Sequence, residues 1–289
     1  MWRRREKKPK KPALVLRLAR RFGYEPGRVM KEVLEWAEVL VVAGVLAFLI
    51  MSFVTVRMHV PTESMVPMIE PRDSFFVDRI SYLFRDPEPG DVIVFWHTDQ
   101  VLLRSVSDEH AAAGLSAGDR LLAVNNQLTY TAEAADAVLA GLPGGTSIQL
   151  QVSGRAPVHV GTKTAAIQSL EDLGITLRER RMRYVKRLIA VGGQTVHLRD
   201  GGIYVDGEPL TGPAFDRFYA SSDPRMAYGV TPTEVPAGHW FVLGDNTYNS
   251  WDSRYWGFVD ERDFIGAPFL RVWPLNRFGL MNNYFGVGP

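Results

Sequence analysis

The sequence predicts a mainly β protein, in which a globular part follows one apolar helix near the N-terminus. Three observations lead to this fold class. An uncharged apolar run covers residues 39–56, short β-rich segments separated by Gly and Pro follow it, and a stretch of different character at 98–182 interrupts them. The 289 residues, of which 46% are hydrophobic and 22% charged, suffice for one large or two smaller domains with hydrophobic cores.

Charge is distributed unevenly along the chain. Residues 1–35 hold 12 Lys/Arg against 4 Asp/Glu, so this segment carries +8, and the remainder carries −7 because the total is +1. Such a basic segment is typical of a nucleic-acid arm or of the cytoplasmic flank of a membrane helix. The adjacent apolar run favours the second interpretation, so we expect no nucleic-acid partner. The chain has no cysteine, which excludes disulfides, thiolate nucleophiles and cysteine zinc sites.

The run at 39–56 contains 18 uncharged residues rich in Val, Leu, Ile and Phe. At 1.5 Å per residue a helix of this length spans about 27 Å, close to the hydrocarbon core of a bilayer. Trp36 suits the interface, Arg57 closes the far end, and no small-x-small cleavage site follows. We therefore predict a transmembrane helix over 36–56 with residues 1–35 in the cytoplasm; a buried helix is the alternative.

The segments that follow are predicted as strands and turns. Ser74–Asp78 and Asp91–Trp96 are rich in β-formers, and the second lacks alternation, which indicates a strand buried on both faces. Residues 98–182 are predicted to form a small domain with a helix at 132–141 and a strand at 147–152.

The β pattern returns after this insertion. Gly192, Gly193, Gly201 and Gly202 punctuate it, and Asp206-Gly207 predicts a hairpin turn. Further strands are expected at His239–Leu243 and Phe269–Pro274, with a long loop at Ala220–Thr233 and a tail that is loop from Asn276.

Ser64 is the first candidate for chemistry. It lies in the segment Val60–Ile69, which begins three residues after the apolar run, between Pro61 and Pro67. Each proline fixes its own φ and biases its neighbour toward extended geometry, so the segment is stiff. A stiff segment can present a nucleophilic hydroxyl in a fixed pose, but it can equally be an ordinary loop that leaves a membrane.

Lys186 is the second candidate, because it stands in an otherwise apolar strand from Tyr184 to Val191. Alternation places Lys186 and Arg187 on opposite faces, so one of the two cations is expected near the core. Burial of an ammonium lowers its pKa until it can serve as a base near neutral pH. The alternative is a side chain that extends along its aliphatic stem to water.

Histidine and metal chemistry find little support. The six histidines lie outside any Gly-x-Ser-x-Gly setting, and His59 is about 16 Å from Ser64 along an extended chain. No spacing typical of a metal site is present, so no metal or organic cofactor is expected.

Four separated segments together resemble the type I signal peptidases, membrane-anchored serine proteases that remove signal peptides from exported proteins. They are Pro61-Thr62-Glu63-Ser64-Met65-Val66-Pro67, Gly90–Phe95, Tyr184–Arg187 and the polar segment Gly244–Val259. The resemblance covers about 57–97 and 183–275. It implies an all-β catalytic domain built from 57–97 and 183–289 on a one-pass anchor.

The resemblance implies roles for individual residues. Ser64 would be the nucleophile and Lys186 its general base, while the hydroxyl of Thr62 would help the amide of Ser64 to bind the oxyanion. Glu63 is a departure, because the family commonly has a small residue at this position. Three further residues would support the lysine, one by orienting it and two as an ion pair: Ser250, Asp252 and Arg254.

The resemblance also implies shallow apolar pockets for small side chains at the first and third residues before the cut. The substrate would lie extended against strand edges. The matching lining positions are Val60, Met65, Tyr184 and Val185.

The insertion at 98–182 lies outside that resemblance. Its segment 113–125, the helix at 132–141 and Gly144-Gly145-Thr146 are similar to parts of bacterial PDZ domains. The usual carboxylate-binding loop is absent at the front, and residues 172–177 would supply it at the back in a circularly permuted domain. This α+β insertion would bind C-termini or extended peptides, or act as a spacer against the catalytic part.

The predicted function is endoproteolysis of the signal peptides of exported preproteins at the outer face of a bacterial cytoplasmic membrane. The expected partners are preprotein signal peptides, the lipid bilayer and a peptide or protein ligand of the insertion. Two alternatives remain open at this stage: an inactive membrane scaffold that carries the insertion, and a relative specialised for one client precursor.

Overall fold

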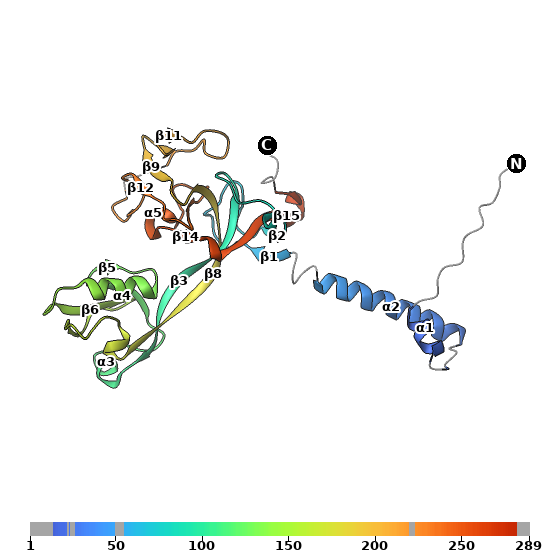
Figure 1. Ribbon diagram of the computed structural model, residues 1–289, viewed down its shortest axis with the longest axis horizontal. Coiled ribbons are helices and arrows are strands. Elements are labelled where there is room, and N and C mark those ends of the chain that lie inside the picture. The colour runs from blue at the N-terminus through green and yellow to red at the C-terminus, as the bar shows by residue number, and fades with distance from the viewer. Residues whose placement is uncertain (1–13, 22, 24–26, 50–54, 220–222, 282–289) are drawn as a thin grey trace.

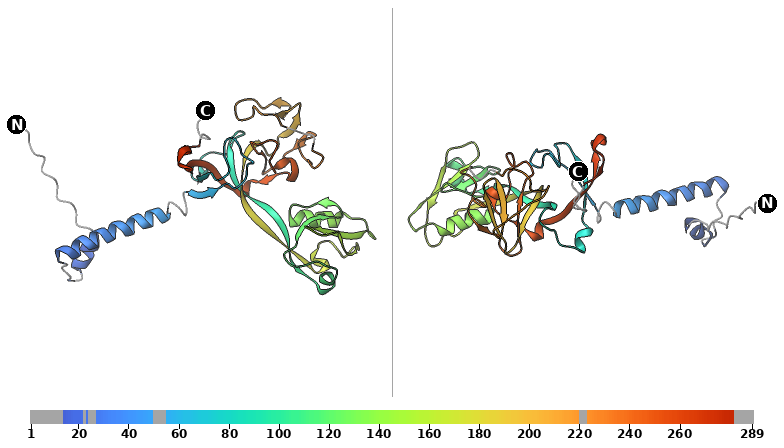
Figure 2. Two further views of the ribbon diagram at one scale, coloured as in Figure 1. Left: turned by 180° about the vertical axis from the view of Figure 1, so that it is seen from behind. Right: turned by 90° about the horizontal axis from the view of Figure 1, so that it is seen from above.

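The computed structural model describes residues 14–21, 23, 27–49, 55–219 and 223–281. Figure 1 shows two helices at one end and a β-rich body, from which a long two-stranded ribbon leads to a separate lobe. The views from behind and from above in Figure 2 show the same arrangement.

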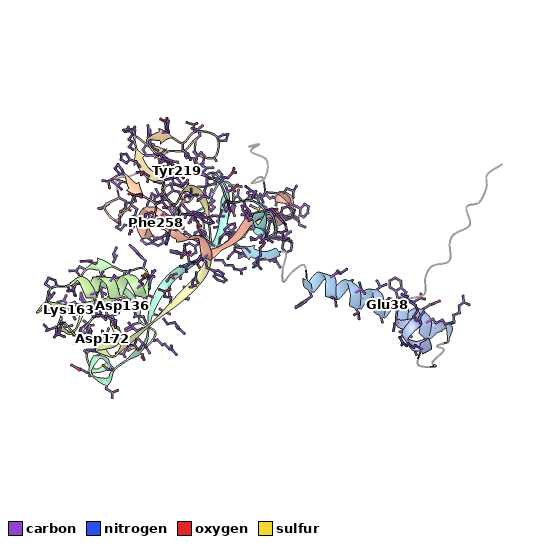
Figure 3. The ribbon with its side chains drawn as sticks, viewed as in Figure 1. Glu38, Asp136, Lys163, Asp172, Tyr219 and Phe258 are labelled. Carbon is purple, nitrogen blue, oxygen red and sulfur yellow. The ribbon has the colours of Figure 1, made fainter. Side chains whose placement is uncertain are left out.

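The N-terminal part consists of α1 (Leu14–Arg21) and α2 (Arg28–Leu49). They contact each other through the backbone N–H of Val15, which donates to Oε2 of Glu38 over 2.8 Å (Figure 3), and the neighbouring side chain of Leu16 is buried. Apolar side chains along α2 are exposed, among them Val39, Leu40, Val41, Val42, Val45, Leu46 and Phe48.

The helix predicted at 36–56 differs from the observed one at both ends. Helix α2 begins earlier, at Arg28, and Thr55 and Val56 lie in strand β1 (Thr55–His59), where Val56 pairs with Val77. Residues 50–54 of the predicted span lie outside the described part of the chain. Within the described ranges, none of the helices combines the length and the apolar character needed to cross a bilayer.

The body is one large sheet built mainly from antiparallel pairs. Strand β1 pairs with β2 (Ser74–Asp78), β2 with β15 (Phe264–Trp273), β15 with β3 (Val92–Val106), β3 with β8 (Ile175–Val191), and β8 with β13 (His239–Leu243). Short elements join this sheet or flank it: η2 (Ser81–Leu83), α5 (Ser253–Trp256), β14 (Val259–Asp260) and η4 (Glu261–Asp263).

The strand predicted at Asp91–Trp96 to be buried on both faces is confirmed from Val92 to Phe95, whereas Trp96 is 42% exposed. Residues Val92 to Phe95 have no exposed surface. Val94 packs in a core with Met65, Phe75 and Val185, whereas its neighbour Phe95 packs with Leu188, Trp240 and Trp256 on the other face. Residues that alternate along one strand thus contribute to two cores, as expected for a strand inside a β structure.

Strands β3 and β8 continue past residues 97 and 182 as a ribbon into the insertion. Their pairing runs from Val92 opposite Arg187 to Val106 opposite Ile175. The lobe at its end contains α3 (Asp108–Ala112), β4 (Arg120–Val124), β5 (Gln127–Leu128), α4 (Ala132–Gly141), β6 (Ser147–Val152), β7 (Val158–Thr162) and η3 (Glu171–Leu173). The predicted helix at 132–141 and strand at 147–152 are confirmed.

The insertion has a hydrophobic core of its own, which includes Leu121, Leu139, Ile148 and Ile175. The carboxylate Oδ1 of Asp136 on α4 accepts from the backbone N–H of Leu170 over 2.9 Å and ties the helix to the segment that leads into β8. Figure 3 places Asp136 in this lobe.

A second sheet of four strands lies beside the body: β9 (Thr195–Arg199), β10 (Gly202–Val205), β11 (Glu208–Pro209) and β12 (Thr233–Glu234). The predicted hairpin turn joins β10 to β11, and both Asp206 and Gly207 adopt positive φ, 53° and 86°. The prediction of a tail that is loop from Asn276 is wrong in part. Residues Leu275–Arg277 form η5, and β16 (Gly279–Leu280) pairs with β15.

Candidate active site

Ser64 lies in a tight loop between β1 and β2. The backbone N–H of Val66 donates to the carbonyl oxygen of Glu63, and that of Ile69 donates to the carbonyl oxygen of Met65. The side chains of Met65 and Ile69 are fully buried, whereas Ser64 is half-buried. Two buried apolar side chains therefore fix the loop on the core and leave the serine hydroxyl at the surface.

Thr62 stands beside this serine. Its hydroxyl oxygen Oγ1 lies 3.4 Å from Oγ of Ser64, and the side chain is exposed. The Thr62 hydroxyl can therefore donate a hydrogen bond to the oxygen of a ligand that approaches Ser64 from solvent. Glu63, between the two, is also exposed, so its carboxylate is directed outward rather than into the core.

Lys186 is buried, with 3% of its surface exposed, opposite Ile93 of β3. Burial lowers the pKa of Lys186 to about 8, because the apolar surroundings disfavour the charged ammonium. Asp252 and Asp245 raise this pKa, and Arg254 lowers it further. A substantial fraction of the amine is therefore neutral near pH 8, as a general base requires.

The expectation that one of the two neighbouring cations lies near the core is confirmed, and the structure buries both, because Arg187 is only 6% exposed. Its guanidinium forms a bidentate pair with Asp245 at 2.7 Å for both bonds and donates to the carbonyl oxygen of Gly90. Arg217 contacts the same carboxylate at 2.9 Å. Alternation along one strand does not reveal such partners, since Asp245 and Arg217 are remote in sequence. The two cations therefore differ in how their charge is compensated. Arg187 is neutralised by a carboxylate, whereas Lys186 forms no salt bridge with any described carboxylate.

The polar segment 244–254 is folded around one buried carboxylate. Asp252 accepts from the backbone N–H of Gly244 over 3.0 Å and forms a bidentate pair with Arg254 at 2.9 Å for both bonds. The guanidinium of Arg254 also donates to the carbonyl oxygen of Thr247. Asp252 and Arg254 are almost fully buried, so the pair fixes the loop that they close.

Two contacts join this segment to the serine loop. The backbone N–H of Asn246 donates to the carbonyl oxygen of Ser64 over 3.0 Å, and its side-chain Nδ2 donates to the carbonyl oxygen of Glu63 over 3.2 Å. Gly244 fits between the two segments, because a Cβ on it would lie 2.1 Å from Oγ of Ser250 and 2.5 Å from the carbonyl oxygen of Ser64. The fold thus brings the hydroxyl of Ser250 and the carbonyl oxygen of Ser64 close together around one glycine.

Strand pairing brings the lysine to the same place. Leu243, the residue before Gly244, pairs with Arg187, the residue after Lys186. The hydroxyl oxygen of Ser250 is buried and has no hydrogen-bond partner among the described residues. A free hydroxyl and a free amine in one buried region suit proton transfer better than structural support.

The residues predicted to line the substrate pockets are divided between the two cores. Val60, Met65 and Val185 are buried in the core behind the serine loop. Tyr184 lies on the other face, where its ring centroid is 5.9 Å from Nζ of Lys186 and its hydroxyl donates to Asp99 over 3.0 Å.

His97 was not singled out from the sequence, yet it lies near the lysine. Its ring centroid is 4.8 Å from that of Tyr184 and 4.2 Å from that of Trp256. Burial, and then the charge of Lys186, lower the pKa of His97 to about 4, so the imidazole is neutral at physiological pH. His59, by contrast, lies 3.2 Å from the hydroxyl of Ser74, measured from its Nδ1.

The chain is similar to known proteins over most of its length. The family described as signal peptidase, peptidase S26, matches residues 33–273. A probable signal peptidase I-2 of Synechocystis is 27% identical over 86% of this chain and 78% of its own length. The signal peptidase I of Mycobacterium tuberculosis is 30% identical over 86% of this chain and 75% of its own.

A crystal structure of a signal peptidase I from Enterococcus faecalis is 34% identical to this chain. It covers 30% of this chain and 82% of its own, with a TM-score of 0.24. The family match extends over most of the sequence and includes every segment that forms the site. The chain therefore belongs to the signal peptidase family, peptidase S26.

Proposed function

We propose that this protein is a serine endopeptidase that removes signal peptides from exported preproteins, with Ser64 as nucleophile and Lys186 as general base. One observation carries the assignment of these two residues. Lys186 is buried, has a pKa of about 8 and lies beside the polar segment 244–254. The backbone of that segment donates a hydrogen bond to the carbonyl oxygen of Ser64, which is half-buried. The family of the chain supports the substrate class.

In the proposed reaction the neutral amine of Lys186 takes the proton of the Ser64 hydroxyl. Oγ of Ser64 attacks the carbonyl carbon of the scissile bond, and the carbonyl oxygen becomes an oxyanion. The backbone N–H of Ser64 and the hydroxyl of Thr62 donate to this oxyanion. The ammonium of Lys186 then gives its proton to the leaving nitrogen, and the C–N bond breaks to leave an ester on Ser64.

The second half of the reaction repeats these roles with water in place of the Ser64 hydroxyl. The amine of Lys186 takes a proton from water, and the hydroxide attacks the ester carbon. The proton returns to Oγ of Ser64 as the C–O bond breaks, so the signal peptide leaves with a new carboxyl group. Lysine can act as base in both halves because it is neutral again once its proton has passed to the leaving nitrogen, and burial lowers its pKa.

The supporting roles are proposed for three residues of the polar segment. Ser250 would accept or donate a hydrogen bond at the amine of Lys186, and its hydroxyl has no other described partner. Asp252 and Arg254 would hold the segment in place through their buried pair. Val60, Met65 and Val185 would form the floor of the pockets for small side chains, with Tyr184 at their rim.

We infer a position at the outer face of a bacterial cytoplasmic membrane, anchored once, with the basic N-terminus inside. Exposed apolar side chains along α2 support this location. A second group of exposed apolar residues lies where β15, η5 and β16 meet, in the same sheet as the strand that follows the helix. This group consists of Trp273, Leu275, Phe278 and Leu280.

The insertion at 98–182 is proposed to be a PDZ-like peptide-binding domain. Strand β8 pairs with β3 along one edge, and β13 pairs with the other edge only from Arg187 onward. The described part of β8 before this point therefore offers an edge to which an extended peptide can add, near α4. Four arginines along this stretch, Arg178, Arg180, Arg181 and Arg183, would keep the edge from pairing with another sheet.

The experiment that tests the catalytic proposal compares wild type with Ser64→Ala and Lys186→Ala on a purified preprotein. Wild type should release the signal peptide, and both variants should lose release although they retain the fold by circular dichroism. Equal activity of either variant and wild type would exclude the proposed pair. An inactive scaffold predicts no processing even by wild type, and a specialised relative predicts processing of only one precursor.

A separate experiment tests the insertion. Residues 100–180 are replaced by a short linker, and both cleavage and peptide binding are measured. Loss of peptide binding with cleavage retained supports a binding domain, and unchanged behaviour in both assays contradicts it.

A further inference from the structure

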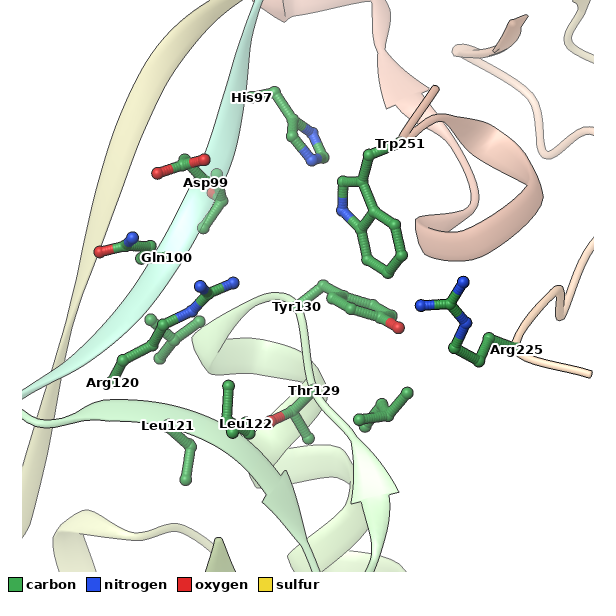
Figure 4. Close-up of a pocket in the computed structure, with 13 residues that line it drawn as sticks. His97, Asp99, Gln100, Arg120, Leu121, Leu122, Thr129, Tyr130, Arg225 and Trp251 are labelled. Atoms are coloured by element: carbon green, nitrogen blue, oxygen red, sulfur yellow. The ribbon is translucent and has the colours of Figure 1, made fainter. Parts of the chain in front are cut away.

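A cleft lies where the insertion meets the catalytic part of the chain. Its volume is about 240 Å³. Figure 4 shows side chains from three parts of the chain around it: the ribbon at His97 to Val101, the insertion, and the catalytic part. The insertion and the catalytic part touch across the cleft, since the rings of Tyr130 and Trp251 meet edge to face at 5.6 Å.

The cleft contains a buried hydroxyl without a partner. Thr129 is 3% exposed, and its Oγ1 makes no hydrogen bond in the part of the chain that the structure describes. A buried hydroxyl that lacks a partner costs free energy, which a bound ligand can recover by accepting or donating a hydrogen bond. Thr129 therefore supplies an unused hydroxyl in the wall of the cleft.

The charges around the cleft favour an anion. In Figure 4 the guanidinium groups of Arg120 and Arg225 enter the space on either side of Tyr130. Arg225 is paired with Asp223, whereas Arg120 forms no salt bridge to any carboxylate within the described ranges. The carboxylate of Asp99 lies on the wall, but it binds Arg180 and the hydroxyl of Tyr184. His97 is neutral at pH 7, so the cations of the cleft are Arg225, which is paired, and Arg120, which interacts with Asp99 only beyond salt-bridge distance.

A chain of contacts connects the cleft with the catalytic residues. Trp251 lines the cleft and directly follows Ser250, which packs against Gly244 beside the carbonyl of Ser64. On the other wall the ring of His97 lies 4.8 Å from that of Tyr184, which lies in turn 5.9 Å from Nζ of Lys186. These two routes place the cleft next to the segments that carry Ser64 and Lys186.

We propose that the cleft is a specificity subsite that binds the side chain of an Asp or Glu in the preprotein, a few residues from the cut. This inference rests on the proposed function. The guanidinium of Arg120 binds the carboxylate, the hydroxyl of Thr129 donates to it, and the rings of Tyr130 and Trp251 pack against the peptide. Arg is suited to this role because its planar donors match a carboxylate.

The test uses the full-length chain and a preprotein scanned with Asp, one position at a time, over five residues on each side of the cut. Each Asp substrate is compared with the Asn substrate at the same position, so that size is constant and only charge changes. The enzymes are wild type, Arg120→Gln, Arg120→Lys and the control Arg104→Gln. Arg104 is an exposed arginine of β3 that does not line the cleft.

We expect one position or two adjacent positions at which wild type prefers Asp over Asn by about five- to tenfold in kcat/KM, mainly through KM. The preference should vanish in Arg120→Gln, survive in part in Arg120→Lys and be unchanged in Arg104→Gln. Equal rates for Asp and Asn at all ten positions in wild type would overturn the proposal. So would a preference that persists in Arg120→Gln.

A binding measurement separates this subsite from general effects on turnover. In the Ser64→Ala background, a peptide with Asp at the preferred position should bind about five- to tenfold more tightly than its Asn counterpart. Adding Thr129→Val should weaken that binding without lowering the midpoint of urea unfolding, because the hydroxyl has no partner to lose. Equal binding of both peptides contradicts the proposal. Arg120-dependent binding of any peptide with a free C-terminus, regardless of Asp, would assign the cleft to C-termini instead.

The two proposals fail in different ways. A reference preprotein without an acidic residue near the cut should be processed equally by wild type and Arg120→Gln. If wild type processes this reference preprotein but cleaves the Asp and Asn substrates at equal rates, only the subsite is wrong. If wild type processes no preprotein at all, the proposed function is wrong and the subsite falls with it.

Discussion

The backbone N–H of Asn246 donates to the carbonyl oxygen of Ser64 over 3.0 Å. This bond joins the loop after β13 to the loop after β1 and fixes one side of the peptide unit that holds the serine. A second bond, from Nδ2 of Asn246 to the carbonyl oxygen of Glu63, fixes the preceding unit. The backbone around the proposed nucleophile is therefore ordered before any substrate binds, which is the condition for an effective oxyanion site.

The pH dependence of cleavage should report the proposed base. Because burial lowers the pKa of Lys186 to about 8, the neutral amine increases with pH up to this value. We expect log kcat/KM to rise with a slope of about 1 below pH 8 and to level off above it. The measurement is a profile of kcat/KM from pH 5 to pH 10 on one preprotein. A rising limb centred near pH 6.5, typical of histidine, would contradict Lys186 as base.

The same lysine should destabilise the fold when it is protonated. Its pKa is about 8 in the folded chain and 10.5 in the unfolded chain, so between these values only the unfolded state holds the proton. The free energy of unfolding therefore rises with pH through this window. Lys186→Met should remove that rise and should stabilise the fold at pH 7 by roughly 3 kcal/mol. Urea unfolding of both proteins at pH 7 and pH 10 provides the measurement, and a variant less stable than wild type at pH 7 would contradict it.

The hydroxyl of Thr62 should act in the transition state. Its Oγ1 lies 3.4 Å from Oγ of Ser64, close enough to donate to an oxyanion formed there. Thr62→Val should lower kcat about 100-fold with little change in KM, because the donor is used only in the transition state. The control Thr62→Ser keeps the hydroxyl and should retain most of the activity. Equal losses in the two variants would indicate a packing role instead.

Gly244 should tolerate no side chain. A Cβ at this position would lie 2.1 Å from Oγ of Ser250 and 2.5 Å from the carbonyl oxygen of Ser64, and the second of these is backbone that cannot rotate away. Gly244→Ala should therefore displace the serine loop and abolish cleavage. Gly144→Ala is the matched control, since a Cβ there meets no atom within 4 Å. Full activity of Gly244→Ala would show that the two segments are not in contact in solution.

The buried ion pair of the polar segment should matter more than a surface pair of the same geometry. Asp252→Asn leaves the guanidinium of Arg254 without its anion in the interior, so we expect a loss of about 3–5 kcal/mol in unfolding free energy. Asp260→Asn breaks the pair with Arg262, which is 90% exposed, and should cost less than about 1 kcal/mol. Urea titrations of both variants compare them directly. Similar losses would mean that burial does not set the strength of these pairs.

Several elements could be predicted at their observed bounds because their signals are local. The strands at Ser74–Asp78, Ser147–Val152 and His239–Leu243 are short β-rich runs next to turn residues, and the helix at 132–141 is a run of Ala and Leu. The ribbon of β3 and β8 was underestimated. The outer half of β8 is charged and rich in arginine, so its β structure depends on pairing with the remote strand β3.

The sequence by itself determined the family, the mainly β class and the identity of the serine and lysine that we propose for catalysis. Each depends on residue types in a fixed local order. The tertiary structure alone decided which charges are neutralised. Arg187 and Lys186 are neighbours in one strand, yet within the described part of the chain only Arg187 has a carboxylate at bonding distance, because Asp245 comes from a distant loop. The electric field at an amine depends on distances through space, and local sequence order does not specify these distances.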